Sequence, residues 1–288
     1  MRIRVEHSTT YCYTEPVRFG RHRLVLRPRE GHDIRVEQMR LQVEPAHRLE
    51  WVLDVFGNSV ALVDFLEPAD RLAIVSEVIV ERMAPFPARD LHGPWRIAFP
   101  PTYEPLEAAI VAPYQAPSFL DGAGPVQAWL QADLTTDPAD AEGTMVALAS
   151  LVNRTIRYRR RAEKGVQPPA ETLELGTGSC RDMATLMMDA ARLLGVAARF
   201  ASGYLHCAAS EAGHASTHAW AEVYLPTLGW RGFDPTSGGA ITPRHIVTGV
   251  SHHPRGVMPV SGIYVGAPSA FSGQQVTVKT EELTPLLC

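Results

Sequence analysis

The first 83 residues of the chain alternate between apolar and polar side chains with little interruption. Between residues 2 and 13, the odd-numbered positions from Ile3 to Tyr11 share one face of an extended chain. Turn-forming stretches such as REGHD and EPAD separate this run from four similar ones, at residues 22–28, 34–45, 48–68 and 71–83. This period of two predicts an antiparallel β-sandwich over residues 1–83.

The character of the chain changes after this region. Residues 84–125 are rich in proline, which predicts an extended linker. Helical signals follow in PVQAWLQADL and in residues 137–160, where Asp137 is a candidate N-cap ahead of Pro138. We therefore divide the chain into a β-sandwich domain at 1–83, a proline-rich linker at 84–125 and a second domain at 126–288.

The strongest helical pattern begins just after the stretch GTGSC. Its apolar residues recur at spacings of three and four and form one stripe: Met183, Leu186, Met187, Ala190, Leu193 and Leu194. Ser179 is a candidate N-cap, and Gly195 stands where a left-handed C′ residue is favoured. Strand-like runs follow at 196–206, 217–226 and 230–236 and again in the tail. This order predicts an α+β core, with the helix packed on an antiparallel sheet.

Three residues of this second domain have the character of a nucleophilic site. Cys180 stands at the helix start, where free backbone N–H groups and the positive end of the helix dipole stabilise a thiolate and can bind an oxyanion. His218 lies in a predicted strand and Asp234 ends the next one, and the PTLG between them indicates a hairpin. A nucleophile, a base and a carboxylate that orients the base form a catalytic triad.

The stretches around these residues resemble a known family. GSCRDMATLMMDAARLLGVAARFASGYL and THAWAEVYLPTLGWRGFDPT, with Cys, His and Asp in that order, are similar to the bacterial transglutaminase-like cysteine hydrolases. The first strands and DVFGNSV resemble the β-domain that precedes the catalytic core in that family. The resemblance implies a papain-like core over 126–288, with Cys180 as the nucleophile, His218 as the general base and acid, and Asp234 as the orienting carboxylate.

The activity implied is that of a cysteine peptidase or amidase that hydrolyses amide bonds through an acyl-enzyme. Two alternatives stay open: acyl transfer from a protein glutamine to an amine, and a peptide-binding module without catalysis. Hydrolysis is favoured because the sequence shows no acidic cluster of the calcium-site type found in regulated cross-linking enzymes. A peptide or protein substrate is expected, and the family analogy adds an ATP-grasp ligase as a possible pathway partner.

The nucleophile segment also departs from the family's commoner form. Many members read GVCQDFAH where this chain reads GSCRDMAT, so Arg181 replaces a neutral amide and predicts recognition of an acidic group. Tyr158 and Tyr204 are candidates for the oxyanion side of the site, with core packing as the alternative for each. Trp220 shares a strand face with His218 and is either a wall of the site or a packed core residue.

Composition narrows the functional classes further. A formal net charge of -4 and a pI near 6.3 give no basis for nucleic-acid binding. No apolar run approaches the roughly 18 residues that span a membrane, and the first residues lack the apolar segment of a secretory signal, so we expect a cytoplasmic protein without membrane contact. The four cysteines form no CxxC pair and are expected to be reduced: Cys12, Cys180, Cys207 and Cys288.

A zinc site is the alternative for one group of histidines and cysteines. His206, Cys207, His214 and His218 lie close in sequence, but strand positions four apart are separated by roughly 13 Å. Only a loop between the strands could gather these side chains. We therefore expect neither a metal nor a cofactor.

Overall fold

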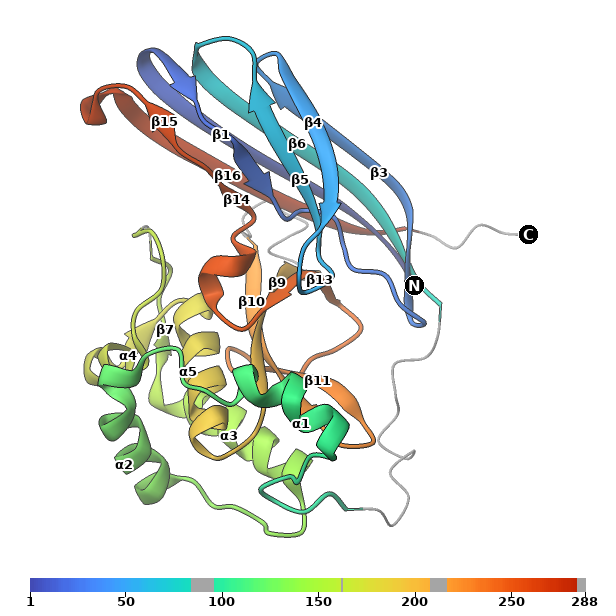
Figure 1. The fold of residues 1–288 in the computed structure, drawn as a ribbon, viewed down its shortest axis with the longest axis vertical. Helices are drawn as coiled ribbons and strands as arrows, with labels where there is room; N and C mark the ends of the chain where they lie inside the picture. The colour runs from blue at the N-terminus through green and yellow to red at the C-terminus, as the bar shows by residue number, and fades with distance from the viewer. Residues whose placement is uncertain (84–95, 162, 208–216, 284–288) are drawn as a thin grey trace.

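Two layers of β-sheet stand above a core of helices and one further sheet in the computed structural model (Figure 1). The structure describes residues 1–83, 96–161, 163–207 and 217–283. The upper layers form the predicted sandwich, and the lower part forms the predicted α+β core. The expected fold class is therefore confirmed.

One sheet of the sandwich is built on the long strand β1 (Arg2–Phe19), which pairs with β6 (Ala69–Arg82), which in turn pairs with β3 (Ile34–Glu44). The other sheet has the order β14 (Val260–Ser261), β2 (His22–Leu24), β5 (Ser59–Phe65) and β4 (His47–Leu53). The alternation seen in the sequence places one face of each strand in the interior. The apolar side chains between the sheets include Phe19, Leu24, Leu26, Val63, Leu72 and Ile74.

The C-terminal strands correct the boundary expected from the sequence. Strand β16 (Phe271–Leu283) runs antiparallel to β1 from Arg2↔Leu283 to Tyr13↔Phe271, and β15 (Tyr264–Val265) pairs with the end of β1. The tail therefore completes the sandwich rather than the core domain. The pattern of residues 260–283 predicts strands correctly, but a period of two does not specify which sheet a strand joins.

The proline-rich segment also differs from the expected linker. Residues 84–95 lie outside the described part of the chain. From residue 104 onward the segment is partly helical, with α1 (Pro105–Val111) and the short 3₁₀ turns η2 (Ala112–Tyr114) and η3 (Leu120–Gly122). Pro105 fits this role because the first helical position needs no backbone N–H.

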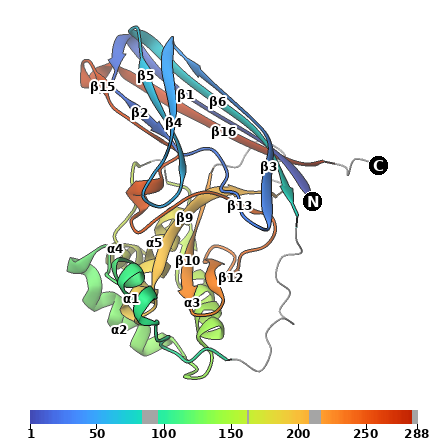
Figure 2. The ribbon, with the colours of Figure 1, turned by 45° about the vertical axis from the view of Figure 1, so that its right-hand side comes forward.

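The sheet of the core has the order β12 (Gly239–Ala240), β11 (Gly229–Asp234), β10 (His218–Leu225), β9 (Ala198–Leu205) and β13 (His245–Ser251), and all its pairings are antiparallel. Helix α5 (Cys180–Leu193) packs against one face of this sheet, surrounded by the remaining helices (Figure 2). The apolar stripe of α5 meets the alternate residues of β10, namely Ala219, Ala221, Val223 and Leu225.

The other helices are α2 (Ala123–Asp133), α3 (Ala141–Thr155) and α4 (Pro169–Leu175). Asp140, not Asp137, caps α3 and accepts a hydrogen bond from the Gly143 N–H at 2.8 Å. Gly195 follows α5 with φ of 81°, the left-handed conformation expected for it. Within the described ranges, every helix is too short or too polar to cross a membrane.

The sandwich and the core share an apolar junction. Ile3 and Val5 of β1 and Val80 of β6 pack with Tyr204 of β9 and Ile246 of β13. Next to this cluster, the Arg82 side chain leaves the end of β6 and donates hydrogen bonds to the carbonyl oxygens of residues 243 and 245. The N-terminal sheet is thereby in direct contact with the strand edge that borders the candidate site.

Candidate active site

Cys180 is the first residue of α5, and a tight loop brings it there. A Cβ atom at Gly178 would lie 2.9 Å from the Asp182 Cβ, so the loop requires glycine at this position. Ser179 is the N-cap of the helix and has an extended backbone. Its N–H and Oγ donate hydrogen bonds to the Asp182 carboxylate at 2.8 and 2.7 Å. Cys180 is 7% exposed. Its N–H belongs to the first helical turn, where amides have no partner within the helix.

His218 and Asp234 meet at the end of the β10–β11 hairpin. His218 opens β10 and Asp234 closes β11, with Leu225 paired to Gly229 across the turn. Thr227 in that turn has φ of 69°. The His218 Nε2 lies 2.9 Å from the Asp234 Oδ2, so the two residues are in contact as the spacing predicts.

The environment of His218 favours its charged form. Burial alone lowers the pKa of His218, but hydrogen bonds to Asp234 and to the Cys180 sulfur, together with their charges, raise it to about 10. Burial raises the pKa of Asp234, but hydrogen bonds from His218, His245 and Thr236 outweigh it and hold that pKa far below its usual range. The three residues expected to act together are therefore in one place.

A second histidine shares the Asp234 carboxylate, and sequence reasoning does not find it. The His245 Nε2 lies 3.3 Å from the same Oδ2 atom, and His245 is 3% exposed. The other oxygen, Oδ1, accepts from the N–H and Oγ of Thr236 at 2.8 and 2.6 Å. Four donors thus surround the carboxylate. His245 opens β13, and its approach depends on how that strand pairs with β9, which no local pattern reveals.

The ligand atoms of His218, Asp234 and His245 all lie within 4.8 Å of one another, the spacing of a possible metal site. The hydrogen bonds of His245 do not fit a metal ligand. Its Nδ1 accepts the Thr242 N–H at 3.1 Å, so this nitrogen carries no proton. A metal on Nε2 requires the proton on Nδ1, where it would face that N–H donor. The donor set therefore fits a hydrogen-bonded carboxylate and not a metal centre.

Comparisons with known proteins agree with this geometry. Residues 3–81 match the bacterial transglutaminase-like N-terminal region, and residues 129–235 match the transglutaminase-like superfamily. Residues 129–235 are therefore a transglutaminase-like region, preceded by a region that matches the N-terminal part of the bacterial proteins. The second match spans Cys180, His218 and Asp234, whereas His245 lies beyond its end.

Relatives of this transglutaminase-like chain extend over nearly all of it. An uncharacterized protein of Mycobacterium leprae is 27% identical over 272 residues, covering 92% of this chain and 94% of the relative. An uncharacterized protein of Mycobacterium tuberculosis is 29% identical over 289 residues, covering 91% and 87%. A Cytophaga hutchinsonii structure, provisionally assigned as a cysteine protease, superposes with a TM-score of 0.73 at 15% identity, covering 100% and 94%. That likeness shows a shared fold, and family and fold together indicate a thiol enzyme.

Two further candidates lie near Cys180 in the transglutaminase-like region. Strand β7 (Arg157–Tyr158) pairs in parallel with β8 (Thr177–Gly178), which sets Tyr158 opposite Gly178. Burial, and next the charge of Cys180, raise the pKa of Tyr158. Arg181 donates a hydrogen bond to the Glu163 carbonyl oxygen at 3.2 Å, and its charge also acts on Tyr158. Both residues therefore belong to the surroundings of Cys180.

The structure places Tyr204 in the junction between the domains and Trp220 beside His218. Tyr204 is 1% exposed in the junction with the sandwich, and its hydroxyl lies 3.1 Å from the His7 Nδ1. The expectation that it serves the oxyanion side is wrong, because its strand position points it into the interdomain core. Trp220 is fully buried, and its ring centroid lies 6.1 Å from that of His218 and 5.2 Å from that of His245. It is both a core residue and a wall of the site.

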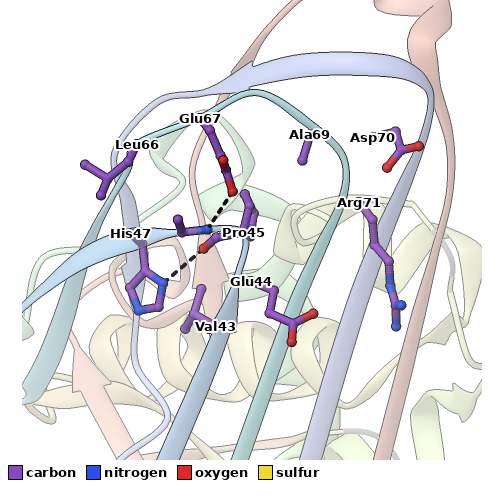
Figure 3. A pocket seen from close by; sticks show the side chains of 10 residues that line it. Val43, Glu44, Pro45, His47, Leu66, Glu67, Ala69, Asp70 and Arg71 are labelled. Carbon is purple, nitrogen blue, oxygen red and sulfur yellow. Dashed lines mark hydrogen bonds between the residues drawn. The ribbon is translucent and has the colours of Figure 1, made fainter.

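His206, one residue of the zinc alternative, lies at the sandwich domain. His206 contacts the Thr280 Oγ of β16 at 2.8 Å, which places it at the sandwich. His214 lies outside the described part of the chain, as does Cys288. A shallow pocket of about 650 Å³ lies at the far end of the sandwich and is lined by none of the candidate site residues (Figure 3). Its Glu67 carboxylate already accepts the Ala46 N–H at 3.3 Å.

Proposed function

We propose that this protein hydrolyses amide bonds of peptides or proteins through an acyl-enzyme on Cys180. The observation that carries the proposal is the 2.9 Å contact of the His218 Nε2 with the Asp234 carboxylate, together with the influence of Cys180, which helps to raise the pKa of His218. A histidine with a raised pKa is an imidazolium at neutral pH, and an imidazolium beside a cysteine at a helix N-terminus stabilises the thiolate. This is the reactive form of the nucleophile.

The reaction then follows in two balanced steps. The thiolate attacks the carbonyl carbon, the C–S bond forms, and His218 gives its Nδ1 proton to the leaving amine as the C–N bond breaks. Water attacks the thioester, His218 takes a proton from it, and the thiolate leaves with release of the carboxylic acid. The Cys180 N–H supports the oxyanion from the first helical turn, with the Tyr158 hydroxyl as the candidate second donor.

Charge beside the nucleophile supports an acidic substrate. Arg160 and Arg181 both act electrostatically on Tyr158, and neither has a carboxylate partner among the residues that the structure describes. A peptide carboxylate could pair with these guanidinium groups, which suit planar recognition of carboxylates. We therefore propose peptides with an acidic residue near the scissile bond as the preferred substrates.

A digest of a peptide library tests the function. We expect wild-type protein to yield fragments that Cys180→Ala does not, with acidic residues enriched near the cleavage points. Cys180→Ala is a conservative control because the side chain is buried and small. Mass spectrometry of the products decides the result, and identical digests from both proteins would contradict the proposal.

The same assay separates hydrolysis from acyl transfer. Both reactions share the acyl-enzyme and differ only in whether water or an amine resolves it. Glutamine-containing peptides are incubated with and without a primary amine donor, and the amine adducts are compared with hydrolysed products. Adducts that exceed hydrolysis would replace the peptidase with a cross-linking enzyme, while the role of Cys180 would stand.

A further inference from the structure

The Asp234 carboxylate is held by two histidines from different strands, β10 and β13. Its Oδ2 atom lies 2.9 Å from the His218 Nε2 and 3.3 Å from the His245 Nε2. His245 accepts the backbone N–H of Thr242 on Nδ1, at 3.1 Å, and a backbone amide can only donate. The single proton of a neutral His245 ring therefore sits on Nε2 and points at Asp234. His218, in contrast, is the charged partner of the same oxygen.

The backbone of His245 is held in turn by the sandwich domain. Arg82, at the end of β6, donates from Nη2 to the His245 carbonyl oxygen at 2.6 Å and from Nε to the Pro243 carbonyl oxygen at 3.2 Å. Its side chain is 10% exposed and forms an ion pair with Asp33. The Trp220 ring packs edge-on against the His245 ring. His245 is thus fixed at its ring and at its main chain.

We propose that His245 is a positioning residue that holds the Asp234 carboxylate against His218, and that Arg82 extends this support to the N-terminal sandwich. The inference rests on the proposed roles of Cys180, His218 and Asp234. Without the His245 donor, Oδ2 retains only His218, and the buried carboxylate loses one of its four contacts. A looser carboxylate orients His218 less well, so the histidine meets the Cys180 sulfur less often in the productive geometry.

The charged and titratable groups that face this cluster come from both the core and the sandwich. In the described part of the chain they are Cys180, His218, Asp234, His245, Arg82 and Asp33. A substitution at His245 removes one donor to Asp234 and leaves the other titratable groups in the sequence. A shift in the titration of His218 then reports on its contact with Asp234.

The test compares His245→Phe, which keeps a flat ring and removes the donor, with His245→Gln, which supplies an amide donor. The rate at which iodoacetamide alkylates Cys180 is measured from pH 5 to 11. This reads the cysteine–histidine pair without any substrate, so it is independent of the peptide digest. We expect the upper inflection, which reports the raised pKa of His218, to fall by about one pH unit in His245→Phe relative to the wild type. His245→Gln should restore most of it.

Steady-state kinetics on a cleaved peptide provide the second readout. We expect kcat of His245→Phe to fall about 10–100-fold with little change in KM. Arg82→Gln should move kcat in the same direction by a smaller factor, whereas Arg21→Gln, which breaks an ion pair with Asp64 within the sandwich, should leave it unchanged. His7→Phe is the matched control for loss of a buried histidine, because His7 contacts Tyr204 and Thr9.

Several results would overturn the proposal. An inflection that stays in place or rises in folded His245→Phe would show that His245 does not support the Asp234–His218 contact. The proposal also fails if His245→Gln behaves like His245→Phe. Should His245→Phe fail to fold, ¹⁵N NMR of wild-type histidines provides the decision: we expect a neutral His245 with its proton on Nε2, and a proton on Nδ1 would refute the assignment.

Discussion

Helix α5 carries a buried carboxylate–guanidinium pair near each end, and the two pairs are built differently. At the N-terminal end, Asp182 contacts Arg161 at 2.8 Å and also accepts from Ser179 and the Gln167 N–H. Near the C-terminal end, Asp189 lies 3.4 Å from Arg192. The first pair is short and shapes the loop ahead of Cys180. The second pair is longer, and Arg192 makes shorter contacts with groups other than Asp189.

Those contacts explain what the C-terminal pair does. Arg192 donates to the carbonyl oxygens of Ala116, Ala198 and His252, at 3.0, 2.7 and 2.6 Å. These oxygens belong to the proline-rich segment, the start of β9 and the residue after β13. Burial lowers the pKa of Arg192 to about 10. The pair thus joins three distant segments to the helix, so this end of α5 stabilises the fold, whereas the proposed chemistry lies at the other end.

The largest effect should come from breaking the C-terminal pair. Arg192→Met removes the guanidinium donor from three carbonyl oxygens and the counter-charge from Asp189. We expect the free energy of unfolding to fall by about 3–5 kcal/mol, with near wild-type activity in the molecules that remain folded. Urea denaturation followed by circular dichroism measures the loss. The control is Arg154→Met: Arg154 lies in the last turn of α3, and the substitution removes its exposed hydrogen bond to the carbonyl oxygen of Asp133 at the end of α2.

The loss of unfolding free energy in Arg192→Met should also depend on pH. Burial raises the pKa of Asp189 above its usual value. The folded protein therefore loses stability as the pH rises through the range in which this carboxyl ionises in the unfolded chain. Without Arg192 that cost increases, and the variant should lose less stability at pH 5 than at pH 8. A loss below about 1 kcal/mol at both pH values would show that the C-terminal end of α5 is not the stabilising one.

The N-terminal pair should show the opposite balance. Asp182→Asn keeps the shape of the side chain but replaces one acceptor oxygen with an NH₂ donor. That donor would face another donor, either the N–H and Oγ of Ser179 or the guanidinium of Arg161. We expect the free energy of unfolding to fall by only about 1–3 kcal/mol. We expect kcat/KM to fall about 10–100-fold, because the loop that presents Cys180 loosens.

Glu163→Gln provides the matched control for Asp182→Asn. Glu163 also contacts Arg161, at 3.5 Å, but its side chain is 71% exposed. An exposed pair contributes little, so activity and stability should both stay near wild type. If Asp182→Asn lost stability as severely as Arg192→Met and kept its activity per folded molecule, the two ends of α5 would not differ in role.

The difference between the ends also shows what a sequence can reveal. The apolar stripe of α5, its Ser179 cap and Gly195 are local features, and each can be predicted from residues within one or two turns. The meeting of His218 with Asp234 is predictable because a short hairpin fixes the register between them. Each of these inferences needs only contacts between neighbours along the chain.

Non-local contacts escape prediction for the same reason. His245 reaches Asp234 through the pairing of β13 with β9, and Arg82 reaches His245 from a different domain. The strand pattern around Tyr204 misleads because it fits a site as well as an interdomain core. The tail has the pattern of strands, yet its return to β1 across the whole chain is a property of the assembled sandwich.

The smallest expected effect lies in charge beside Cys180 and concerns choice of substrate. Arg181 is bound only to the Glu163 carbonyl oxygen among the described residues, so its charge is available to a substrate. We expect Arg181→Gln to lower kcat/KM about 3–10-fold for peptides with an acidic residue near the scissile bond, and by less than about twofold for neutral peptides. The difference should shrink at high salt, because exposed charges are screened.

Arg40→Gln removes one positive charge from the sandwich strand β3 and controls for the change in net charge. It should leave both classes of peptide unaffected. Equal losses for acidic and neutral peptides in Arg181→Gln would mean that Arg181 supports the loop, as Asp182 does, and does not select the substrate. A loss confined to acidic peptides would place specificity at the same end of α5 as the nucleophile, because the C-terminal end is occupied by its carbonyl contacts.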